Sequence, residues 1–600
     1  MAQNAIAFAN NDVITIAWSY DRRPDGCMGF ALYRIDHNQK ETPLPSHAVF
    51  PGDTIRPGQT TRDYPVQKFY WKDVYARLES ERTGNRKYRY RVVPLEGRPK
   101  GLQPMTSVPD MTTNEVTISP QLPGGIAAYF NRGLLSTQRV ARALGANLNP
   151  KSLNTLIADP TNGLRASLSS DMVEALIGFL DRTQAGGKIY AALYELNDQE
   201  LVAKLEGLGH DLEIVLANSV VTSTTTDKKT KKKKTTKSDG NDDARLRLAK
   251  SCGPHGKWDR IMPSNHIAHN KFLVYVDAAK RPIAVLLGST NWTPNGLCAQ
   301  TNNTLVIQDA DVAGRYLDYW KQLAADTEAA NGVPKDLQRK AFRGWNSKGK
   351  SFPMSGGATL ESWFSPNTPG PRGKPKQEKQ PNDMAAVVKA IDGAKSAILF
   401  LVFYPGSPSV ANWTAKASRK DKQLFVRGCV TNKSASEGFY YALKGMTPPP
   451  KKQGQKRAIR QDPRVFGAEA LDGKHIPKGW QRELLKAGFA IIHDKILVID
   501  PFSDNCVVVT GSHNLGHKAS YDNDENLVIV RGDKELATAY TVHVLDVWDH
   551  FAWRYLVKRE GKQAADQSLE TKPEEWLGRY FDAQGKIKSA QLAFWMGAKV

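Results

Sequence analysis

The sequence predicts a multidomain protein in which an N-terminal β-sandwich precedes two packed α/β halves. Three observations support this fold class. Short strand-like runs between Gly, Pro and Asp residues dominate residues 5–112. Farther along the chain, apolar runs alternate with helical patterns, which is typical of α/β folds. One stretch of this second region occurs twice, so we expect two related halves.

Residues 5–112 are predicted to form the β-sandwich, because several runs have the β-branched and aromatic content of strands. An early strand carries Trp18, and a late one carries Tyr88-Arg89-Tyr90-Arg91-Val92. This order resembles fibronectin type III domains. Residues 95–125 are rich in Pro, Gly, Thr and Ser and are expected to form a linker. The predicted strands are 13–18, 30–35, 69–71 and 87–93.

The repeated stretch places a histidine and a lysine two residues apart, in front of an apolar run. His269 and Lys271 open the first copy, and His493 and Lys495 open the second. In a strand, residues i and i+2 face the same side, so each His–Lys pair should point at one site. Downstream, each copy continues with a Gly-Ser-x-Asn stretch, which contains Ser289 and Asn291 in the first copy and Ser512 and Asn514 in the second.

This duplicated pattern resembles the phospholipase D superfamily, whose mark is H-x-K-x4-D followed by G-(S/G)-x-N. The second copy fits it in full, with Asp500 as the acidic residue. In the first copy one additional residue separates Lys271 from Asp277, and we expect it to form a β-bulge. The resemblance covers roughly residues 125–560. It implies two α/β halves packed face to face with a pseudo-twofold relation.

The elements around the motifs also repeat. Residues 126–186 are expected to be helical and to lead into the first half, and Asn197 with Glu200 resembles a capping box. The alternation of strands and helices predicts largely parallel sheets. The expected strands are 188–194, 212–217 and 305–307 in the first half and 397–403, 424–427 and 527–530 in the second, with closing helices at 312–326 and 536–555.

The predicted domains are a β-sandwich at 5–112, a first half at 126–350, a second half at 358–558 and a C-terminal capping segment at 559–600. A Pro/Gly/Lys linker at 364–382 joins the halves. Residues 222–243 carry seven lysines between 228 and 237, and we expect a mobile loop there. This loop and the basic run at 448–457 could contact phosphates of lipid or nucleic acid.

Composition limits the partners. The chain has 600 residues and a net charge of +22, which favours anionic partners. Its five cysteines are odd in number and lack metal-ligand spacing, so we expect neither a disulfide framework nor structural zinc, and no cofactor. No secretory signal is evident, and the most apolar run, 397–404, is too short to span a bilayer. We expect a cytoplasmic protein without a transmembrane segment, with signal-independent export left open.

The resemblance implies phosphodiester chemistry that needs no metal. One neutral imidazole attacks phosphorus and forms a phosphohistidine, while the other protonates the leaving alcohol and later activates water. The lysines, serines and asparagines stabilise the phosphoryl oxygens. Glu525 is predicted to orient His269 as the nucleophile, with Asn303 as its uncharged counterpart. The predicted catalytic set is His269, Lys271, Ser289, Asn291, His493, Lys495, Asp500, Ser512, Asn514 and Glu525.

The motif fixes the bond that is cleaved but not the alcohols on either side of it. Phospholipid head groups are favoured, because one long chain carries two full motifs and basic segments. A nuclease is the alternative, supported by the charge and by the stretch Gly288-Ser289-Thr290-Asn291-Trp292-Thr293. A non-catalytic polyanion-binding scaffold is the third interpretation. Because one chain contains both half-sites, a monomer would be sufficient for activity.

Overall fold

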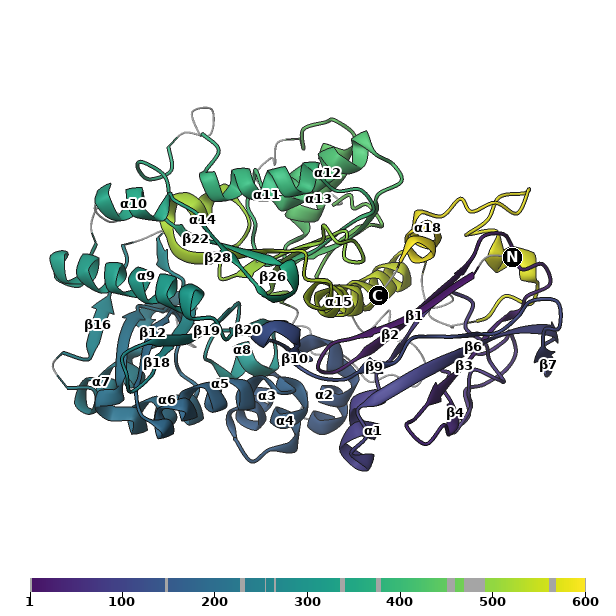
Figure 1. Cartoon of the computed structure of the whole chain (residues 1–600), viewed down its shortest axis with the longest axis horizontal. Helices are drawn as coiled ribbons and strands as arrows, with labels where there is room; N and C mark the ends of the chain where they lie inside the picture. The colour runs from purple at the N-terminus through teal and green to yellow at the C-terminus, as the bar shows by residue number, and fades with distance from the viewer. Residues whose placement is uncertain are drawn as a thin grey trace.

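The computed structural model describes residues 3–145, 149–226, 233–253, 255–263, 266–334, 340–373, 379–449, 459–468, 491–560 and 568–598. These residues form a β-rich N-terminal region and two mixed α/β halves, each built on one large sheet (Figure 1). In Figure 1 the second half lies above the first, and the N-terminal region lies beside both. Within the described ranges, no helix has the length and apolar character needed to cross a membrane.

The N-terminal region contains two sheets whose aromatic side chains meet in a common core. The rings of Trp18 and Phe30 lie 5.2 Å apart, one from each sheet. One sheet has the order β1 (Gln3–Ala9), β2 (Ile14–Tyr20), β5 (Tyr70–Asp73). The other has the order β4 (Glu41–Pro43), β3 (Gly29–Ile35), β6 (Lys87–Arg98), β7 (Gly101–Pro104), with β8 (Met111–Thr112) and β9 (Val116–Thr117) also paired to β6.

The four predicted strands of this region are present, but two expectations were wrong. Helix α1 (Ala76–Thr83) interrupts the region that was expected to be all β. The predicted linker 95–125 contains the end of β6 and the short strands β7, β8 and β9, because its polar residues pair at the edge of the β6 sheet. The resemblance to fibronectin type III domains stays a prediction.

The sheets of the two halves have matching strand orders. The first is β10 (Gln121–Leu122), β11 (Ile126–Phe130), β20 (Asn303–Ile307), β19 (Pro282–Gly288), β18 (Lys271–Val276), β12 (Lys188–Leu193), β13 (Leu212–Ala217), β16 (Lys257–Arg260). The second is β21 (Lys350–Pro353), β22 (Thr359–Ser365), β28 (Asn523–Arg531), β27 (Val507–Gly511), β26 (Lys495–Ile499), β23 (Ala397–Val402), β24 (Phe425–Val430), β25 (Val465–Gly467). A pseudo-twofold relation between them stays a prediction.

The expectation of largely parallel sheets was wrong. In the first sheet only β12–β13 and β13–β16 are parallel, and all other neighbours are antiparallel. Along the strand order given above, the second sheet repeats this pattern, with β23–β24 and β24–β25 as the parallel pairs. The reason is that each motif strand turns directly into the next strand without a helix, and short connections produce antiparallel pairs.

Helices cover both faces of each sheet. The two long helices, α9 (Ala310–Ala329) and α15 (Lys534–Glu560), pack against the first and the second sheet respectively and share one buried cluster that joins the halves. Helices of the outer faces are α2 (Thr137–Leu144), α3 (Pro150–Ala158), α4 (Gly163–Ser169), α5 (Met172–Leu180), α6 (Gln199–Leu208), α7 (Asp242–Ser251), α11 (Asn382–Asp392), α12 (Val410–Lys420) and α13 (Lys433–Leu443). The remaining helices are α8 (Pro294–Cys298), α10 (Lys340–Asn346) and α14 (His517–Asp522).

Three further local predictions need correction. The stretch 126–186, which was expected to be helical throughout, begins with strand β11, because its apolar residues pair with β20. The N-cap of α6 is Asp198, whose side chain accepts a hydrogen bond from the amide of Leu201, and not Asn197. The linker at 364–382 does not join the halves, because it follows β22, which already belongs to the second sheet, and leads to α11; its residues 374–378 lie outside the described part of the chain.

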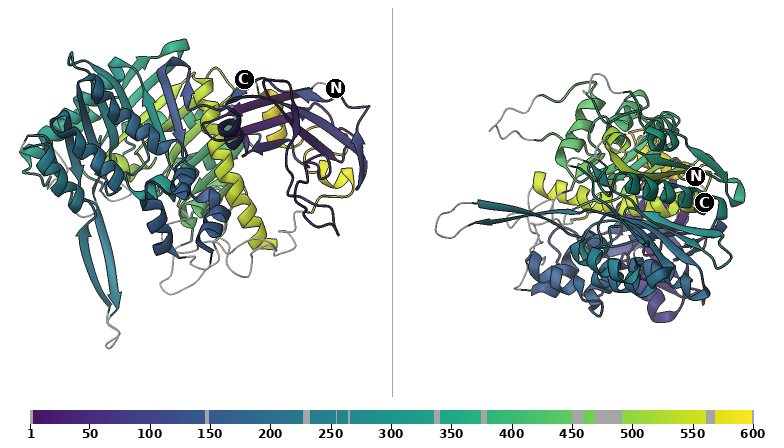
Figure 2. Two further views of the ribbon diagram at one scale, coloured as in Figure 1. Left: turned by 90° about the horizontal axis from the view of Figure 1, so that it is seen from below. Right: turned by 90° about the vertical axis from the view of Figure 1, so that its left-hand side faces the viewer.

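The lysine-rich insertion of the first half is a hairpin where a loop was expected. Strands β14 (Val220–Thr226) and β15 (Lys233–Asp239) pair antiparallel, because their threonines favour extended backbone. Figure 2 shows the hairpin extending away from the body of the molecule. Residues 227–232 lie outside the described part of the chain, as do residues 450–457 of the second basic run.

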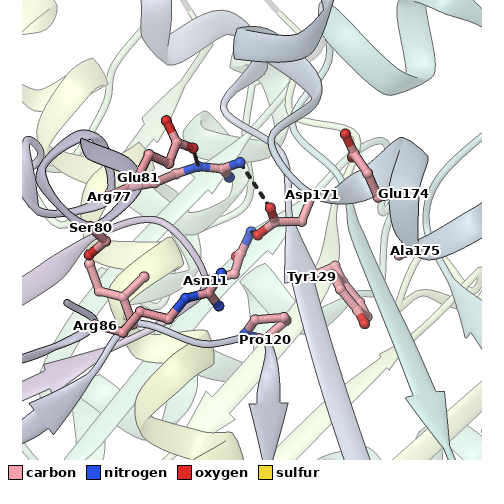
Figure 3. Close-up of a pocket in the computed structure, with 11 residues that line it drawn as sticks. Asn11, Arg77, Ser80, Glu81, Arg86, Pro120, Tyr129, Asp171, Glu174 and Ala175 are labelled. Atoms are coloured by element: carbon pink, nitrogen blue, oxygen red, sulfur yellow. Dashed lines mark hydrogen bonds and ion pairs between the residues drawn. The ribbon is translucent and has the colours of Figure 1, made fainter. Parts of the chain in front are cut away.

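A cavity lies where the N-terminal region meets the first half (Figure 3). Arg77 of α1 spans it, forming ion pairs with Glu81 and with Asp171, each at 2.8 Å. Tyr129 and Glu174 line the opposite side. None of the predicted catalytic residues lines this cavity, so it belongs to the interface between these two regions.

The C-terminal segment packs on the N-terminal region. It contains α17 (Pro573–Leu577) and α18 (Ala590–Gly597). Trp576 is fully buried, with its ring 5.9 Å from that of Phe30 and 5.6 Å from that of Phe69, and its indole N–H donates to the carbonyl of Cys27 at 3.0 Å. The two ends of the chain therefore share one core.

Substitution of Trp576 should destabilise this core. Trp576→Ala removes a buried aromatic side chain and leaves the Cys27 carbonyl without its donor, so we expect a loss of about 3–5 kcal/mol in the free energy of unfolding, measured by urea denaturation. Leu78→Ala is the matched control, because Leu78 is 52% exposed and its loss should change stability by less than about 0.5 kcal/mol. Equal effects of the two substitutions would contradict the shared core.

Candidate active site

The two repeated motifs meet because each half lends a short segment to the other. Residues Ile267–Ala268 form β17, which pairs in parallel with the start of β28 in the second half. In the reverse direction, Ile492 pairs with Thr301. These segments immediately precede His269 and His493, whose ring centroids lie 6.4 Å apart. The imidazoles of both halves therefore face one site.

His269 is fixed by a carboxylate of the opposite half. Its Nδ1 donates to Oε2 of Glu525 at 2.8 Å, and its backbone amide donates to the carbonyl of Asp524 at 2.9 Å. Glu525 also accepts from the hydroxyl of Ser512 at 2.7 Å and from the amide of Asn523 at 3.0 Å. With Nδ1 engaged as the donor, Nε2 of the neutral ring carries the free lone pair.

His493 has the same arrangement, but its acceptor is an amide. Nδ1 of His493 lies 2.8 Å from Oδ1 of Asn302, which also accepts from the hydroxyl of Ser289 at 2.8 Å. The amide nitrogen of Asn302 donates to the carbonyl of Gly296 at 2.8 Å, so the oxygen must face the imidazole. The two histidines therefore have the same hydrogen-bonding geometry, but the acceptor at Nδ1 is a charged carboxylate for His269 and an uncharged amide for His493.

Asn302, and not Asn303, is the uncharged counterpart of Glu525. Asn302 lies 13 residues after Ser289, and Glu525 lies 13 residues after Ser512. Each accepts a hydrogen bond from that serine. The predicted counterpart, Asn303, instead donates to Thr510 and Tyr540, both at 2.8 Å. The prediction was wrong by one residue. The equal spacing from Ser289 and from Ser512 to their acceptors selects Asn302.

The lysines are buried beside the histidines. Lys271 Nζ donates to the carbonyl of His269 at 2.6 Å and lies 5.0 Å from the ring centroid of Tyr194. Lys495 Nζ likewise donates to the carbonyl of His493 and lies 5.2 Å from the ring centroid of Phe403. Burial lowers the pKa of Lys271 to about 7. Burial, with the repulsion of Lys271, also holds the pKa of Lys495 well below its ordinary value.

Burial has the same effect on the imidazoles. It lowers the pKa of His269 to about 4, although the charge of Glu525 acts in the opposite direction. It also lowers the pKa of His493 well below its ordinary value, and the neighbouring lysines reinforce the effect. Burial alone would raise the pKa of Glu525, but the charge and hydrogen bond of His269 outweigh it and bring that pKa to about 2. The site therefore holds two neutral imidazoles and an ionised Glu525 at neutral pH.

The serines support the histidines from within. Ser289 donates to Asn302 and accepts from the amide of Asn303, and Ser512 repeats this with Glu525 and Asn526. Because each hydroxyl proton already has an acceptor, the predicted contact of the serines with phosphoryl oxygens is replaced by a positioning role. The side chains of Asn291 and Asn514 differ from the serines in this respect. Among the described residues, neither side-chain oxygen has a hydrogen-bond partner, although both are buried.

The two aspartates of the motifs lie away from the histidines. Asp500 accepts from the backbone amides of Lys395, Ser396 and Ala397 at 2.7–2.8 Å and so ties the end of β26 to the start of β23. Asp500 lies five positions after Lys495, which is about 16 Å along a strand. Its inclusion among the catalytic residues is therefore corrected to a structural role.

The predicted bulge in the first motif strand is not present. The pairing of β18 with β19 shifts register between Tyr275 and Val276, but the skipped residue is Ile283 of β19, and β18 pairs with β12 without interruption from Lys271 to Val276. The additional residue instead makes β18 one residue longer than β26, and Asp277 forms an ion pair with Arg281 at 2.8 Å in the following turn. The irregularity leaves the His269 end of the strand unchanged.

The middle residue of each motif anchors it to a long helix. Asp494 accepts from His543 of α15 at 3.0 Å, and Asn270 donates to Tyr319 of α9 at 3.0 Å. A buried ion pair adds to this support, since Arg260 contacts Asp524 at 2.6 Å across the two halves. Among the residues that the structure describes, no group of three or more His, Cys, Asp or Glu side chains could hold a metal ion.

A family model supports the assignment of the second half. Residues 387–548, which include His493, Lys495 and Glu525, match the model described as cardiolipin synthase, PLD-like domain. This region belongs to the phospholipase D superfamily. The first motif copy lies outside the matched residues. The comparison with curated proteins gave no match.

Several solved structures resemble the chain at low identity. The phospholipase D family member Nuc from Salmonella typhimurium is 18% identical, with 32% of this chain and 95% of Nuc covered and a TM-score of 0.20. Phosphatidylserine synthase from Haemophilus influenzae is 10% identical, with 63% of this chain and 84% of the synthase covered and a TM-score of 0.37. Polyphosphate kinase from Porphyromonas gingivalis is also 10% identical, with 88% of this chain and 74% of the kinase covered and a TM-score of 0.34. At these scores the likenesses say nothing about the substrate of this chain.

Sequence reasoning missed two residues of this phospholipase D-like site. Asn302 could have been found from the equal spacing of the two serines to their acceptors. Glu195 follows β12 and accepts from the amide of Asn291 at 2.5 Å. No motif marks it, because its position next to the Gly-Ser-x-Asn turn arises only when β12 pairs with β18.

The buried His269 of this site should make the protein sensitive to acid. Between pH 6.5 and about 4, the unfolded chain binds a proton on His269 that the folded chain does not, so the free energy of unfolding falls as the pH is lowered. His269→Asn should reduce this fall by roughly 2–3 kcal/mol, measured by urea denaturation across that range. The exposed His37 provides the control, because His37→Asn should keep the wild-type dependence. A His269→Asn protein with the wild-type dependence would show that the imidazole is not held neutral.

Proposed function

We propose that the chain is a metal-independent phosphodiesterase that hydrolyses phosphodiester bonds through a phosphohistidine intermediate, with phospholipid head groups as its substrates. One observation carries the proposal. Two neutral imidazoles, one from each half, face one site with their Nδ1 atoms engaged and with a lysine side chain beside each. This is the minimum set for double displacement at phosphorus: a nucleophile, a proton carrier and lysines whose positive charge a bound anion stabilises.

In the first step, Nε2 of His269 attacks phosphorus, an N–P bond forms, and the P–O bond to the alcohol breaks. The alcohol oxygen takes a proton from Nε2 of protonated His493. A bound phosphodiester anion raises the proton affinity of the imidazole beside it and so supplies the protonated form of His493. In the second step, His493 accepts a proton from water, the water oxygen bonds to phosphorus, and the N–P bond breaks.

The difference between Glu525 and Asn302 supports His269 as the nucleophile. An imidazole that bonds to phosphorus through Nε2 acquires positive charge, and the carboxylate at its Nδ1 stabilises that charge. The amide of Asn302 offers His493 a weaker stabilisation, so protonated His493 releases its proton more readily. We place the two lysines and the side-chain amides of Asn291 and Asn514 next to the substrate.

Two observations bear on the substrate. The matched family model bears the name of an enzyme of lipid metabolism, which favours phospholipid. The net charge of +22 and the lysine-bearing hairpin β14–β15 favour nucleic acid, so a nuclease is the second candidate. Both half-sites lie in one chain, and we propose that a monomer is sufficient.

A substrate panel separates the two candidates. The purified chain is offered phospholipid vesicles and single- and double-stranded DNA and RNA, each with and without EDTA. We expect release of head groups from vesicles, unchanged by EDTA and reduced by about 10²- to 10⁴-fold in His269→Ala and in His493→Ala. Cleavage of nucleic acid alone would select the nuclease, and turnover of neither class would favour a polyanion-binding scaffold. Inhibition by EDTA that a divalent ion reverses would overturn the mechanism.

The roles of the two histidines can be separated with bis(p-nitrophenyl) phosphate. Its leaving group needs no proton, so His493→Ala should still be phosphorylated on His269, but it lacks the base that activates water. We expect a burst of one equivalent of p-nitrophenol followed by slow turnover, with the adduct on His269 identified by mass spectrometry. An adduct on His493 in the His269→Ala protein, with no adduct on His269 in His493→Ala, would reverse the assignment.

A further inference from the structure

Glu195 is a carboxylate within the site that the proposed mechanism does not use. It follows β12 by two residues, and its backbone carbonyl accepts from the amide of Trp292 at 3.0 Å. Its Oε2 accepts from Nδ2 of Asn291 at 2.5 Å, and Ser219 provides a second hydrogen bond. The side chain is half-buried, unlike the buried histidines and lysines. Glu195 is therefore a group of the site that a ligand can reach.

The second half has no counterpart of this carboxylate. Leu193 pairs with Lys271 and Val402 pairs with Lys495, so the residue two positions farther along is Glu195 in one half and Tyr404 in the other. The intervening residues, Tyr194 and Phe403, do match, because each ring lies beside the lysine of its own half. The position of Glu195 is thus one at which the two half-sites differ in charge.

Glu195 interacts with the charges of both halves. Burial raises its pKa, while Lys271 and Lys495 act to lower it. With Glu195 ionised, the site holds a second carboxylate besides Glu525, while burial lowers the pKa of both lysines. A second carboxylate repels a phosphodiester anion, so its presence needs a compensating attraction to another part of the substrate.

A carboxylate only accepts hydrogen bonds, so that attraction must come from a donor on the substrate. The phosphoryl oxygens avoid Glu195 and turn toward the lysines, which leaves the side of Glu195 for one of the two esterified alcohols. A hydroxyl or an ammonium group on that alcohol would form a charge-assisted hydrogen bond there. An alcohol without a donor would leave the carboxylate facing apolar atoms.

The geometry points to Glu195 as a specificity-determining residue that binds a hydroxyl or ammonium group on the alcohol next to the phosphate. This inference rests on the proposed function, because it places a phosphodiester between the two histidines. It names the substrate class as diesters of polar alcohols that can donate a hydrogen bond, such as aminoalcohols and polyols.

Three probes that differ in one group test this contact: p-nitrophenyl ethyl phosphate, p-nitrophenyl 2-hydroxyethyl phosphate and p-nitrophenyl 2-aminoethyl phosphate. The wild-type chain should show kcat/KM about 10- to 100-fold higher for a probe with a donor than for the ethyl probe. Comparison of the hydroxyl and ammonium probes distinguishes polyol from aminoalcohol recognition. In Glu195→Gln, whose amide oxygen can still accept from Asn291, the ratio should approach 1. Tyr404→Phe, at the matching position of the second half, should keep the wild-type ratio.

The outcomes separate this inference from the proposed function. Hydrolysis of all three probes with equal kcat/KM, or an unchanged ratio in Glu195→Gln, would overturn the role of Glu195 and leave the phosphodiesterase in place. If no probe is hydrolysed, binding of 2-aminoethyl phosphate, 2-hydroxyethyl phosphate and ethyl phosphate by calorimetry still tests the contact. Tighter binding of either donor-bearing phosphate that Glu195→Gln removes would support the inference, and equal binding of all three would overturn it.

Discussion

The hydrogen bond from His269 to Glu525 joins the two halves at the point where the chemistry is proposed to occur. It exists because β17 leaves the first half and pairs with β28 of the second, which places His269 beside the acceptor that follows Asp524. The reciprocal pairing of Ile492 with Thr301 places His493 beside Asn302. Each imidazole is therefore held by the half to which it does not belong. Separation of the halves would remove the orientation of both rings at once.

The cost of this arrangement is the burial of charged and polar groups. Two lysines and Glu525 lie in surroundings that disfavour an isolated charge, and buried charges are tolerated when they are paired and hydrogen-bonded. The middle residues of the motifs reach α9 and α15, and Arg260 bridges to Asp524, so the site is supported by the same elements that join the halves. Burial in turn keeps both imidazoles neutral, which suits a nucleophile.

Much of this fold follows from local pattern. The strands around both motifs and the two long helices could be predicted, because apolar periodicity and the duplicated spacing report them directly. The mixed strand order could not, since the pattern of a buried strand does not record the direction of its neighbour. Strand β11 was missed for a related reason: its pairing with β20, 173 to 181 residues away in sequence, is a long-range contact that no local signal marks.

The site shows the same division. The motif gave the histidines and lysines by residue type, and their placement followed once the halves paired. Asp500 was grouped with them because it belongs to the motif, although its carboxylate serves the backbone at the opposite end of the strand. Glu195 belongs to no motif and becomes visible only beside Asn291. Sequence patterns thus identify the groups that recur in both halves better than those that distinguish the halves.

The central claim is that His269 and His493 act on one phosphorus atom. A crystal structure of the chain with orthovanadate, which adopts the geometry of a phosphoryl group in transfer, tests it most directly. The account predicts a single vanadium atom between Nε2 of His269 and Nε2 of His493, with its oxygens near Lys271 and Lys495. Vanadate bound at another place, or at one imidazole with the other turned away, would contradict it.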